Sequence, residues 1–444
     1  MTRRDRRWLL AAVAFTLVVR LGLTAAVLMV RQDTTAFRTV DSGQYLELGG
    51  ALARGEGFAT AGKPELFRLP GYPLLVALGA WMGEPTTVTV IIQAILGAVT
   101  TWLCFLCGRA VAGPPAGLTA AWLYAVEPGQ WAWSTMVLSE TLFTALTTTT
   151  LFLAMTYLRT GRRSALLWAA TAAAACAYVR IVGYILPAIV LGGCAVLRSR
   201  VVTEGSRRAV WRDAAAAAAV AALLLGGWHV RNGLRAGYWG FSTQFERAIY
   251  FIGAGTVEAR NRGSYVEAVG ALRRDVEQQG ARDPSGVAND MRRVGLERIA
   301  RDPAAVLATY VGGIAVTMLH PGTGAIMRLL QPNASYTGSS VTQMMTLGRW
   351  DTAWNLVRQK PPGYWLLTVP LFAAGIVYLG LFAAGAWTGR SSPVIILPCV
   401  MALCLILCSG GPDGDSRRRA PLVPLMCVVA APLFAGRRSV EGRA

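Results

Sequence analysis

Apolar runs long enough to cross a bilayer recur along the chain, with short polar connections between them. The first run, Trp8 to Val30, is apolar for roughly the 20 residues that about 30 Å of hydrocarbon requires. Repeated runs of this kind predict an all-α polytopic membrane protein with about 11 transmembrane helices, within a range of about 10 to 13. The other predicted apolar segments are Val88 to Cys107, Ala116 to Val126, Ser134 to Tyr157, Leu166 to Tyr178, Val182 to Leu197, Ala214 to Trp228, Ala304 to Leu319, Tyr364 to Trp387, Val394 to Cys408 and Leu422 to Phe434.

The distribution of basic residues orients these spans. Four arginines precede the first run, and further basic groups occupy short loops such as Arg159 to Arg163, so the N-terminus is predicted to be cytoplasmic. We therefore expect one transmembrane domain over residues 1–444. Residues 31–87 form its first extracytoplasmic loop, with interfacial helices at Asp41 to Arg54 and Leu74 to Met82, and residues 229–303 form a large extracytoplasmic loop.

Composition argues against nucleic-acid binding, a multi-histidine metal site and a disulfide framework. The chain is 54% hydrophobic and carries a formal charge of +19, but its cations are scattered through short loops and form no basic stripe, so nucleic acid is not an expected partner. Only two histidines are present, which excludes a multi-histidine metal site. The eight cysteines all fall in apolar runs, where they predict packing and no disulfide framework.

Candidate chemistry gathers directly after the first span. Asp41 and Tyr45 lie in Val40-Asp41-Ser42-Gly43-Gln44-Tyr45, and Arg68 and Tyr72 lie in Phe67-Arg68-Leu69-Pro70-Gly71-Tyr72-Pro73. Asp41 could simply cap a helix, since Asp is a preferred N-cap residue. A carboxylate and a guanidinium could instead activate an acceptor hydroxyl and bind a phosphate leaving group.

Other polar residues lie at the predicted outer ends of later spans. Glu140 begins one such helix, and Arg180 lies in the turn between two others. Trp228-His229-Val230-Arg231-Asn232 closes another span, where an aromatic and basic anchor at the membrane surface is an equally good interpretation. Arg419 precedes two prolines that open a helix, which suits an anion at the interface. Charges at membrane depth are costly, so these residues are candidates for a functional site.

The order of these motifs resembles the GT-C glycosyltransferases of the protein O-mannosyltransferase and lipid A aminoarabinose transferase type. The resemblance covers nearly the whole chain, from residue 8 to about 434. This sequence differs from the lipid A transferases at one motif. Those enzymes have an acid and a lysine before their proline turn, whereas this chain has Phe67-Arg68 there. That departure argues against an aminoarabinose donor.

The resemblance implies a GT-C fold and an integral-membrane glycosyltransferase. The enzyme would move a sugar, with mannose the best guess, from a polyprenyl-phosphate donor to an acceptor hydroxyl, with inversion, at the extracytoplasmic face of the plasma membrane. Asp41 would be the catalytic base, Glu140 would orient the acceptor or the sugar, and the donor phosphate would bind Arg68, Arg231 and Arg419. The residues implied in substrate binding are Tyr45, Tyr72, Arg180, His229 and Asn232.

Other points stay open at the level of sequence. The acceptor could be a protein, a glycan, a lipid or a secreted peptide product, and no motif specifies a cofactor or a divalent metal. A lipid-linked-sugar flippase or transporter is one alternative, although its polar residues would be expected at the middle of the membrane. A non-catalytic membrane protein is the other, and it would tolerate Asp41→Asn.

Overall fold

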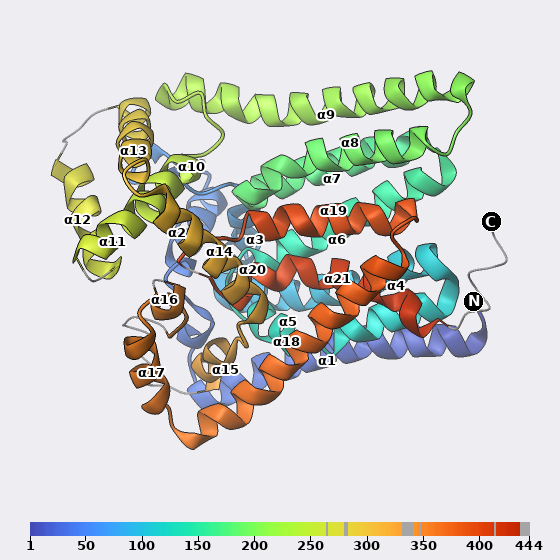
Figure 1. The fold of residues 1–444 in the computed structure, drawn as a ribbon, viewed down its shortest axis with the longest axis horizontal. Helices are drawn as coiled ribbons and strands as arrows, with labels where there is room; N and C mark the ends of the chain where they lie inside the picture. The colour runs from blue at the N-terminus through green and yellow to red at the C-terminus, as the bar shows by residue number, and fades with distance from the viewer. Residues whose placement is uncertain (263–264, 279–282, 331–340, 347, 413, 436–444) are drawn as a thin grey trace.

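The computed structural model describes residues 1–262, 265–278, 283–330, 341–346, 348–412 and 414–435. This part of the chain is a bundle of helices, and its only strands are a short antiparallel pair, β1 (Ala59–Thr60) and β2 (Lys63–Pro64) (Figure 1). The prediction of an all-α polytopic membrane protein is confirmed.

The bundle is built from long apolar helices with shorter ones packed between them. Its elements are α1 (Arg3–Arg31), α2 (Ser42–Ala53), α3 (Gly71–Trp81), α4 (Pro85–Ala125), α5 (Pro128–Ser134), α6 (Glu140–Thr160), α7 (Arg163–Val179), α8 (Leu186–Ser199), α9 (Glu204–Ala236), α14 (Pro303–Leu319), α18 (Pro362–Thr388), α19 (Pro393–Leu407), α20 (Ser416–Arg419) and α21 (Val423–Ala430).

A second group of helices lies at one end of this bundle, while the N-terminus lies at the opposite end (Figure 1). The segment 229–303 that the sequence predicts as a large loop contains several of these helices, and the connection between His320 and Pro362 also contains short helices. The elements of the group are α10 (Gln244–Arg247), α11 (Gly255–Arg262), α12 (Tyr265–Gln278), α13 (Pro284–Ile299), α15 (Thr323–Leu330), α16 (Val341–Thr346) and α17 (Trp350–Arg358).

Length and composition identify six helices of the described chain as candidate membrane spans, and α13 with α14 would form a seventh, bent by 102°. Three apolar helices, α3, α7 and α19, are shorter than a crossing requires. The six candidates include α4 as one helix of 41 residues, although its backbone reverses in the middle. The total of about 11 spans, the loop boundaries and the sides of the membrane therefore stay predictions.

The reversal within α4 follows from its sequence. Ala112 and Gly113 leave helical geometry, and the φ of +83° at Gly113 is a left-handed value that glycine adopts readily. Two prolines begin the second half. The halves then pack closely, because a Cβ on Gly117 would lie 2.7 Å from the carbonyl oxygen of Phe105. The break lies between the two apolar segments predicted at Val88 to Cys107 and Ala116 to Val126.

A polar seam joins α1 to α4. The hydroxyls of Thr16 and Thr101 are hydrogen-bonded at 2.8 Å, and the buried Arg20 donates to the Thr16 carbonyl at 3.2 Å. The Arg20 guanidinium lies so near Gly97 that a Cβ there would be 2.5 Å from Nε. A larger residue at position 97 would therefore require the Arg20 side chain of α1 to move.

Candidate active site

Asp41 lies at the start of α2, where an aspartate could cap the helix, but its carboxylate accepts no capping hydrogen bond. Its Oδ1 accepts from Nη2 of Arg68 at 2.7 Å, and its Oδ2 accepts from Nη1 of Arg417 at 2.6 Å. The side chain is 30% exposed. Both carboxylate oxygens are therefore held by cations from segments distant in sequence, which a helix cap would not require.

Arg417 joins Asp41 to Glu140. Its Nε donates to Glu140 Oε1, which also accepts from Nη1 of Arg180. The resulting charged cluster consists of Asp41, Arg68, Glu140, Arg180 and Arg417. It contains three guanidinium groups and two carboxylates, so one positive charge is in excess. The excess positive charge of this cluster would favour the binding of one further anion beside it.

Local structure brings the two acids together. Glu140 opens α6, where the helix dipole favours a negative charge, and its side chain is only 1% exposed. Ser42 follows Asp41, and its hydroxyl donates to the carbonyl of Val137, just before α6, at 2.8 Å. The Val137 amide in turn donates to the Phe37 carbonyl at 2.8 Å. These bonds fix the start of α2 against the start of α6.

The predicted substrate-binding tyrosines lie behind Arg68. The Tyr45 hydroxyl accepts from Arg68 Nη1 at 3.3 Å, and the guanidinium lies over the Tyr45 ring at 4.8 Å. Tyr72 meets Tyr45 edge to face at 4.8 Å and donates to Gln93 at 2.9 Å. Both rings are buried. In this structure the tyrosines support Arg68, and their contact with a substrate stays a prediction.

The arginines determine the protonation of Asp41. Burial acts to raise the pKa of Asp41, but the charges of Arg417 and Arg68 outweigh burial, and the net shift is downward. Burial acts to lower the pKa of Arg417, but Glu140 and Asp41 outweigh it and the net shift is upward. Asp41 is therefore a carboxylate, and Arg417 a cation, throughout the physiological range.

Arg231 lies outside the charged cluster. Its Nη2 donates to the carbonyl of Phe58 at 2.7 Å and its Nη1 to the carbonyl of Glu65 at 2.8 Å, while the guanidinium lies over the Trp228 ring at 4.7 Å. These bonds fasten the end of α9 to the segment that precedes Arg68. A role in phosphate binding stays a prediction that none of these contacts supports.

The neighbours of Arg231 are also engaged in local structure. Nδ2 of the buried Asn232 donates to the carbonyl of Gly240 at 2.9 Å, so it stabilises the turn after α9. His229 bonds through Nδ1 to the Trp239 carbonyl at 2.7 Å, which makes that nitrogen the donor, and through Nε2 to the Tyr184 hydroxyl at 3.0 Å. We call His229, Arg231 and Asn232 the α9 anchor.

Arg419 is the third arginine predicted to hold phosphate, and its side chain is buried away from Asp41. It donates to the carbonyl of Met318, in α14. Arg417, two residues earlier, takes part in the charged cluster instead. The run Arg417-Arg418-Arg419 was the sequence feature that could have indicated Arg417. Successive residues of a helix point about 100° apart, so only one of these three arginines can face a given site. The sequence does not determine which.

Metal ligation has little support in the described residues, because no group of three or more His, Cys, Asp and Glu side chains gathers there. Asp41 and Glu140 both direct carboxylate oxygens at guanidinium groups. The Arg417 guanidinium bonds to both carboxylates, so it occupies the place between them that a bridging metal ion would take.

Comparisons with known proteins agree with this architecture. Residues 63–226 match the family model described as dolichyl-phosphate-mannose-protein mannosyltransferase. The apo oligosaccharyltransferase of Archaeoglobus fulgidus is similar over 97% of this chain and 51% of its own length, with 16% identity and a TM-score of 0.54. ArnT from Cupriavidus metallidurans, bound to undecaprenyl phosphate, is similar over 95% of this chain and 77% of its own, with 13% identity and a TM-score of 0.45. No curated protein matches the chain.

These likenesses define a class. The chain is a multi-pass membrane protein with the GT-C fold, and the resemblance to GT-C glycosyltransferases that its motifs indicated is confirmed. It spans about half the length of the oligosaccharyltransferase that it matches.

Proposed function

We propose that the protein is a glycosyltransferase that moves a sugar from a polyprenyl-phosphate donor to an acceptor hydroxyl at the extracytoplasmic face of the plasma membrane. The family model that matches residues 63–226 carries a dolichyl-phosphate-mannose description, and mannose is the sugar to test first. One solved structure with the same fold, the oligosaccharyltransferase AglB of Archaeoglobus fulgidus, is a complex with an inhibitory peptide and a dolichol phosphate.

The charged cluster is the observation that carries this proposal. A polyprenyl-phosphate sugar is a phosphodiester with one negative charge, which would neutralise the single positive excess among Asp41, Arg68, Glu140, Arg180 and Arg417. Arg68 and Arg417 both donate to Asp41, the more exposed of the two carboxylates in the cluster. Guanidinium groups suit bidentate phosphate binding. Arg68 and Arg417 would therefore hold the phosphate, while Arg180 holds Glu140.

Asp41 is the better candidate for the base. Its side chain is 30% exposed, whereas that of Glu140 is 1% exposed, so an acceptor can reach Asp41 alone. A base held by two cations is weak, because their charges keep its pKa low. Donor phosphate would compete for Arg68 and Arg417, which raises the pKa of Asp41 and strengthens it as a base once the donor is bound.

The reaction then follows in one displacement. The acceptor oxygen attacks the anomeric carbon, its proton passes to Asp41, and the bond from that carbon to the phosphate oxygen breaks. The electron pair leaves with the polyprenyl phosphate, whose additional negative charge Arg68 and Arg417 stabilise. A single displacement inverts the anomeric carbon. Glu140 would act through Arg417 and Arg180 to position these groups.

The test is release of free polyprenyl phosphate from polyprenyl-phosphate mannose by the purified protein in lipid nanodiscs. An extract of bacterial envelopes supplies acceptors, and polyprenyl-phosphate glucose serves as the comparison donor. We expect release that depends on the extract and on Asp41. Absence of release from either donor, with donor binding intact, would contradict the transferase function. Release from the glucose donor alone would contradict only the choice of mannose.

A further inference from the structure

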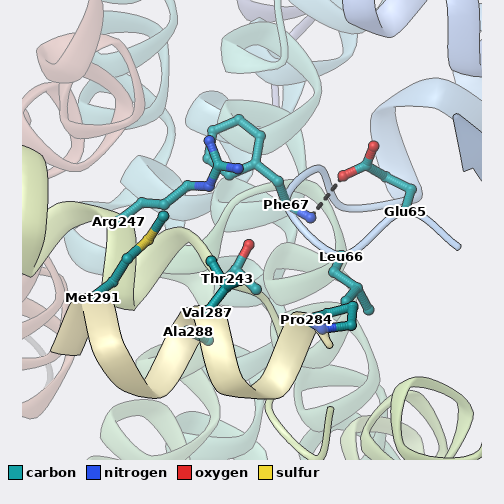
Figure 2. A pocket seen from close by; sticks show the side chains of 9 residues that line it. All are labelled: Glu65, Leu66, Phe67, Thr243, Arg247, Pro284, Val287, Ala288 and Met291. Atoms are coloured by element: carbon teal, nitrogen blue, oxygen red, sulfur yellow. Dashed lines mark hydrogen bonds between the residues drawn. The ribbon is translucent and has the colours of Figure 1, made fainter. Parts of the chain in front are cut away.

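A cleft of about 240 Å³ lies within the second group of helices, between residues 65–67, α10 and the first half of α13 (Figure 2). Arg247 and Glu65 both line it, and the charge of Glu65 acts on Arg247. The Glu65 carboxylate also accepts from the amides of Phe67 and Arg68 at 2.6 and 2.9 Å. The cleft therefore contains its own counter-charge. The surface of α17, in the same group of helices, is different.

The position of α17 places it at the level where the membrane begins. It lies across the end of the bundle, transverse to α1, and only three residues separate it from α18 (Figure 1). α18 is an apolar helix of 27 residues, long enough to cross a bilayer. Its first turns expose large apolar side chains, with Leu366 79% and Val369 60% exposed. These side chains require hydrocarbon around them, so α17 lies at the membrane surface.

The two tryptophans of α17 define one side of the helix. Trp350 is 62% exposed and Trp354 is 55% exposed, and residues four apart in a helix lie on the same face. At about 100° per residue, the buried Ala353 lies on one side of them and the exposed Asp351 and Asn355 lie on the other. A helix with a protein-facing side, a tryptophan side and a polar side suits the interfacial layer of a bilayer.

Basic residues flank the tryptophans. Arg349 precedes the helix, and Arg358 and Lys360 follow its second tryptophan. The Arg358 guanidinium lies over the Trp354 ring at 5.2 Å, so the cation and the ring lie at one depth. In the part of the chain that the structure describes, none of the three cations forms an ion pair with a carboxylate. Asp351 supplies the one negative charge of this segment, which leaves two positive charges in excess.

We propose that α17 is an interfacial helix that binds the headgroups of anionic phospholipids, with phosphatidylglycerol as the representative lipid. Arg358 and Lys360 would donate to the headgroup phosphate, while Trp350 and Trp354 would lie among the upper acyl-chain carbons. The excess of positive charge favours an anionic lipid over a zwitterionic one. This inference does not depend on the proposed transferase function, because the lipid bound here is not consumed.

Photocrosslinking identifies what covers the tryptophan side. The probe is p-benzoylphenylalanine in place of Trp354, in the full-length protein in bilayers with equal amounts of phosphatidylglycerol and phosphatidylcholine. The same probe in place of Asn355, on the polar side, is the comparison. We expect lipid adducts from position 354 and none above background from position 355, as mass spectrometry would show. Equal lipid yields from both positions, or adducts from position 354 mainly with protein, would overturn the proposal.

The headgroup preference is measured from the same adducts. At position 354 we expect phosphatidylglycerol adducts to exceed phosphatidylcholine adducts by about fivefold, an effect that one cation near an anionic surface can give. Arg358→Gln with Lys360→Gln should bring the ratio close to one. Arg274→Gln with Arg292→Gln removes the same charge from exposed positions on α12 and α13 and should keep the ratio. A parent ratio near one, or a ratio that survives loss of Arg358 and Lys360, would contradict the proposal.

Polyprenyl phosphate also carries an anionic phosphate, so a small amount of it in the same bilayers distinguishes the two lipids. If the adduct at position 354 is enriched in polyprenyl phosphate over phosphatidylglycerol, α17 belongs to the path of the donor and the phospholipid proposal is wrong. Binding of polyprenyl-phosphate mannose should be unchanged in Arg358→Gln with Lys360→Gln, because both residues lie outside the charged cluster. A rise in its Kd that matches the loss of lipid adducts would likewise assign α17 to the donor.

Discussion

The charged cluster and the α9 anchor each contain an arginine that the surrounding residues hold rigidly, but the two arginines have different partners. Arg417 bonds to the carboxylates of Asp41 and Glu140, in a group with one positive charge in excess. Arg231 bonds to backbone carbonyls of Phe58 and Glu65. Carbonyls carry no net charge, and removing their donor leaves them unpaired.

This difference separates a binding arginine from a structural one. A phosphate can compete with a carboxylate for a guanidinium because both are anions, and the displaced carboxylate gains basicity. A phosphate that displaced the Glu65 carbonyl from Arg231 would remove the side-chain donor of that carbonyl and offer it no replacement. We therefore expect substitutions in the charged cluster to change catalysis, and substitutions in the α9 anchor to change stability.

The largest expected effect comes from Asp41→Asn. Asn has nearly the same shape but cannot accept a proton from the acceptor, so transfer should fall by at least about a hundredfold. Donor binding should stay close to that of the parent, whereas loss of the two ion pairs of Asp41 should lower the thermal midpoint at neutral pH, as donor titration and thermal scans would show. Turnover within a few-fold of the parent would remove Asp41 from the chemistry and favour Glu140 as the base.

The next largest effect is expected for Arg417, the residue that the sequence did not single out. Arg417→Lys keeps the charge but cannot bridge two carboxylates, so we expect turnover to fall by about tenfold to a hundredfold and the donor KM to rise. Arg419→Lys is the matched control, since Arg419 bonds to the Met318 carbonyl. Equal losses of turnover in the two variants would show that Arg417 is structural as well.

Arg68→Ala should give a similar but smaller loss. It removes a phosphate contact made in both the ground state and the transition state, so the donor KM should rise by about tenfold while turnover falls less. Steady-state kinetics with varied donor would separate the two constants. Unchanged kinetics would indicate that Arg68 only anchors the protein to lipid headgroups.

Arg231→Gln tests the structural role assigned to the α9 anchor. Without Arg231 the Glu65 carbonyl loses its side-chain donor and the Phe58 carbonyl keeps only the Glu65 amide, so the free energy of unfolding should fall by about 1–3 kcal/mol, while the donor KM changes less than about twofold. The exposed Arg235→Gln, on the same helix, is the control for charge. A tenfold rise in donor KM at unchanged stability would restore Arg231 to the phosphate site.

The smallest effect is on the pH dependence of stability. The pKa of Asp41 is lower in the folded protein than its unfolded value of about 3.9, so the contribution of this group is complete above that pH and is lost as the pH falls further. The difference in thermal midpoint between the parent and Asp41→Asn should therefore shrink below about pH 4. A difference that grows on acidification would mean that the pKa of Asp41 is raised.

Sequence patterns anticipated the elements whose cause is local. The apolar runs, the break between Cys107 and Ala116 and the short helix after Pro70 depend on composition, glycine and proline, all of which can be read directly. The sequence also placed Asp41 and Arg68 in one region after the first span, although it did not predict that the two side chains pair.

The remaining features depend on tertiary contacts. Arg417 reaches Asp41 from 376 positions along the chain, and nothing in the run of three arginines distinguishes it from Arg419. The buried amide of Asn232 and the carbonyl contacts of Arg231 depend on the path of the chain after α9. Residue type indicated that these side chains mattered, but their partners determine whether they bind substrate or support the fold.

The backbone around Glu65 has a consequence for how this protein can vary. Arg231 holds the carbonyls of Phe58 and Glu65, and the Glu65 side chain holds the amide of Arg68, so the chain from Glu65 to Arg68 has a fixed length. One residue inserted or deleted there would shift Arg68 away from Asp41, whereas a residue inserted in the turn between β1 and β2 would leave the paired ends of the hairpin in place. Related proteins that keep this site should therefore keep the length from Glu65 to Arg68, and insertions should collect at the hairpin turn.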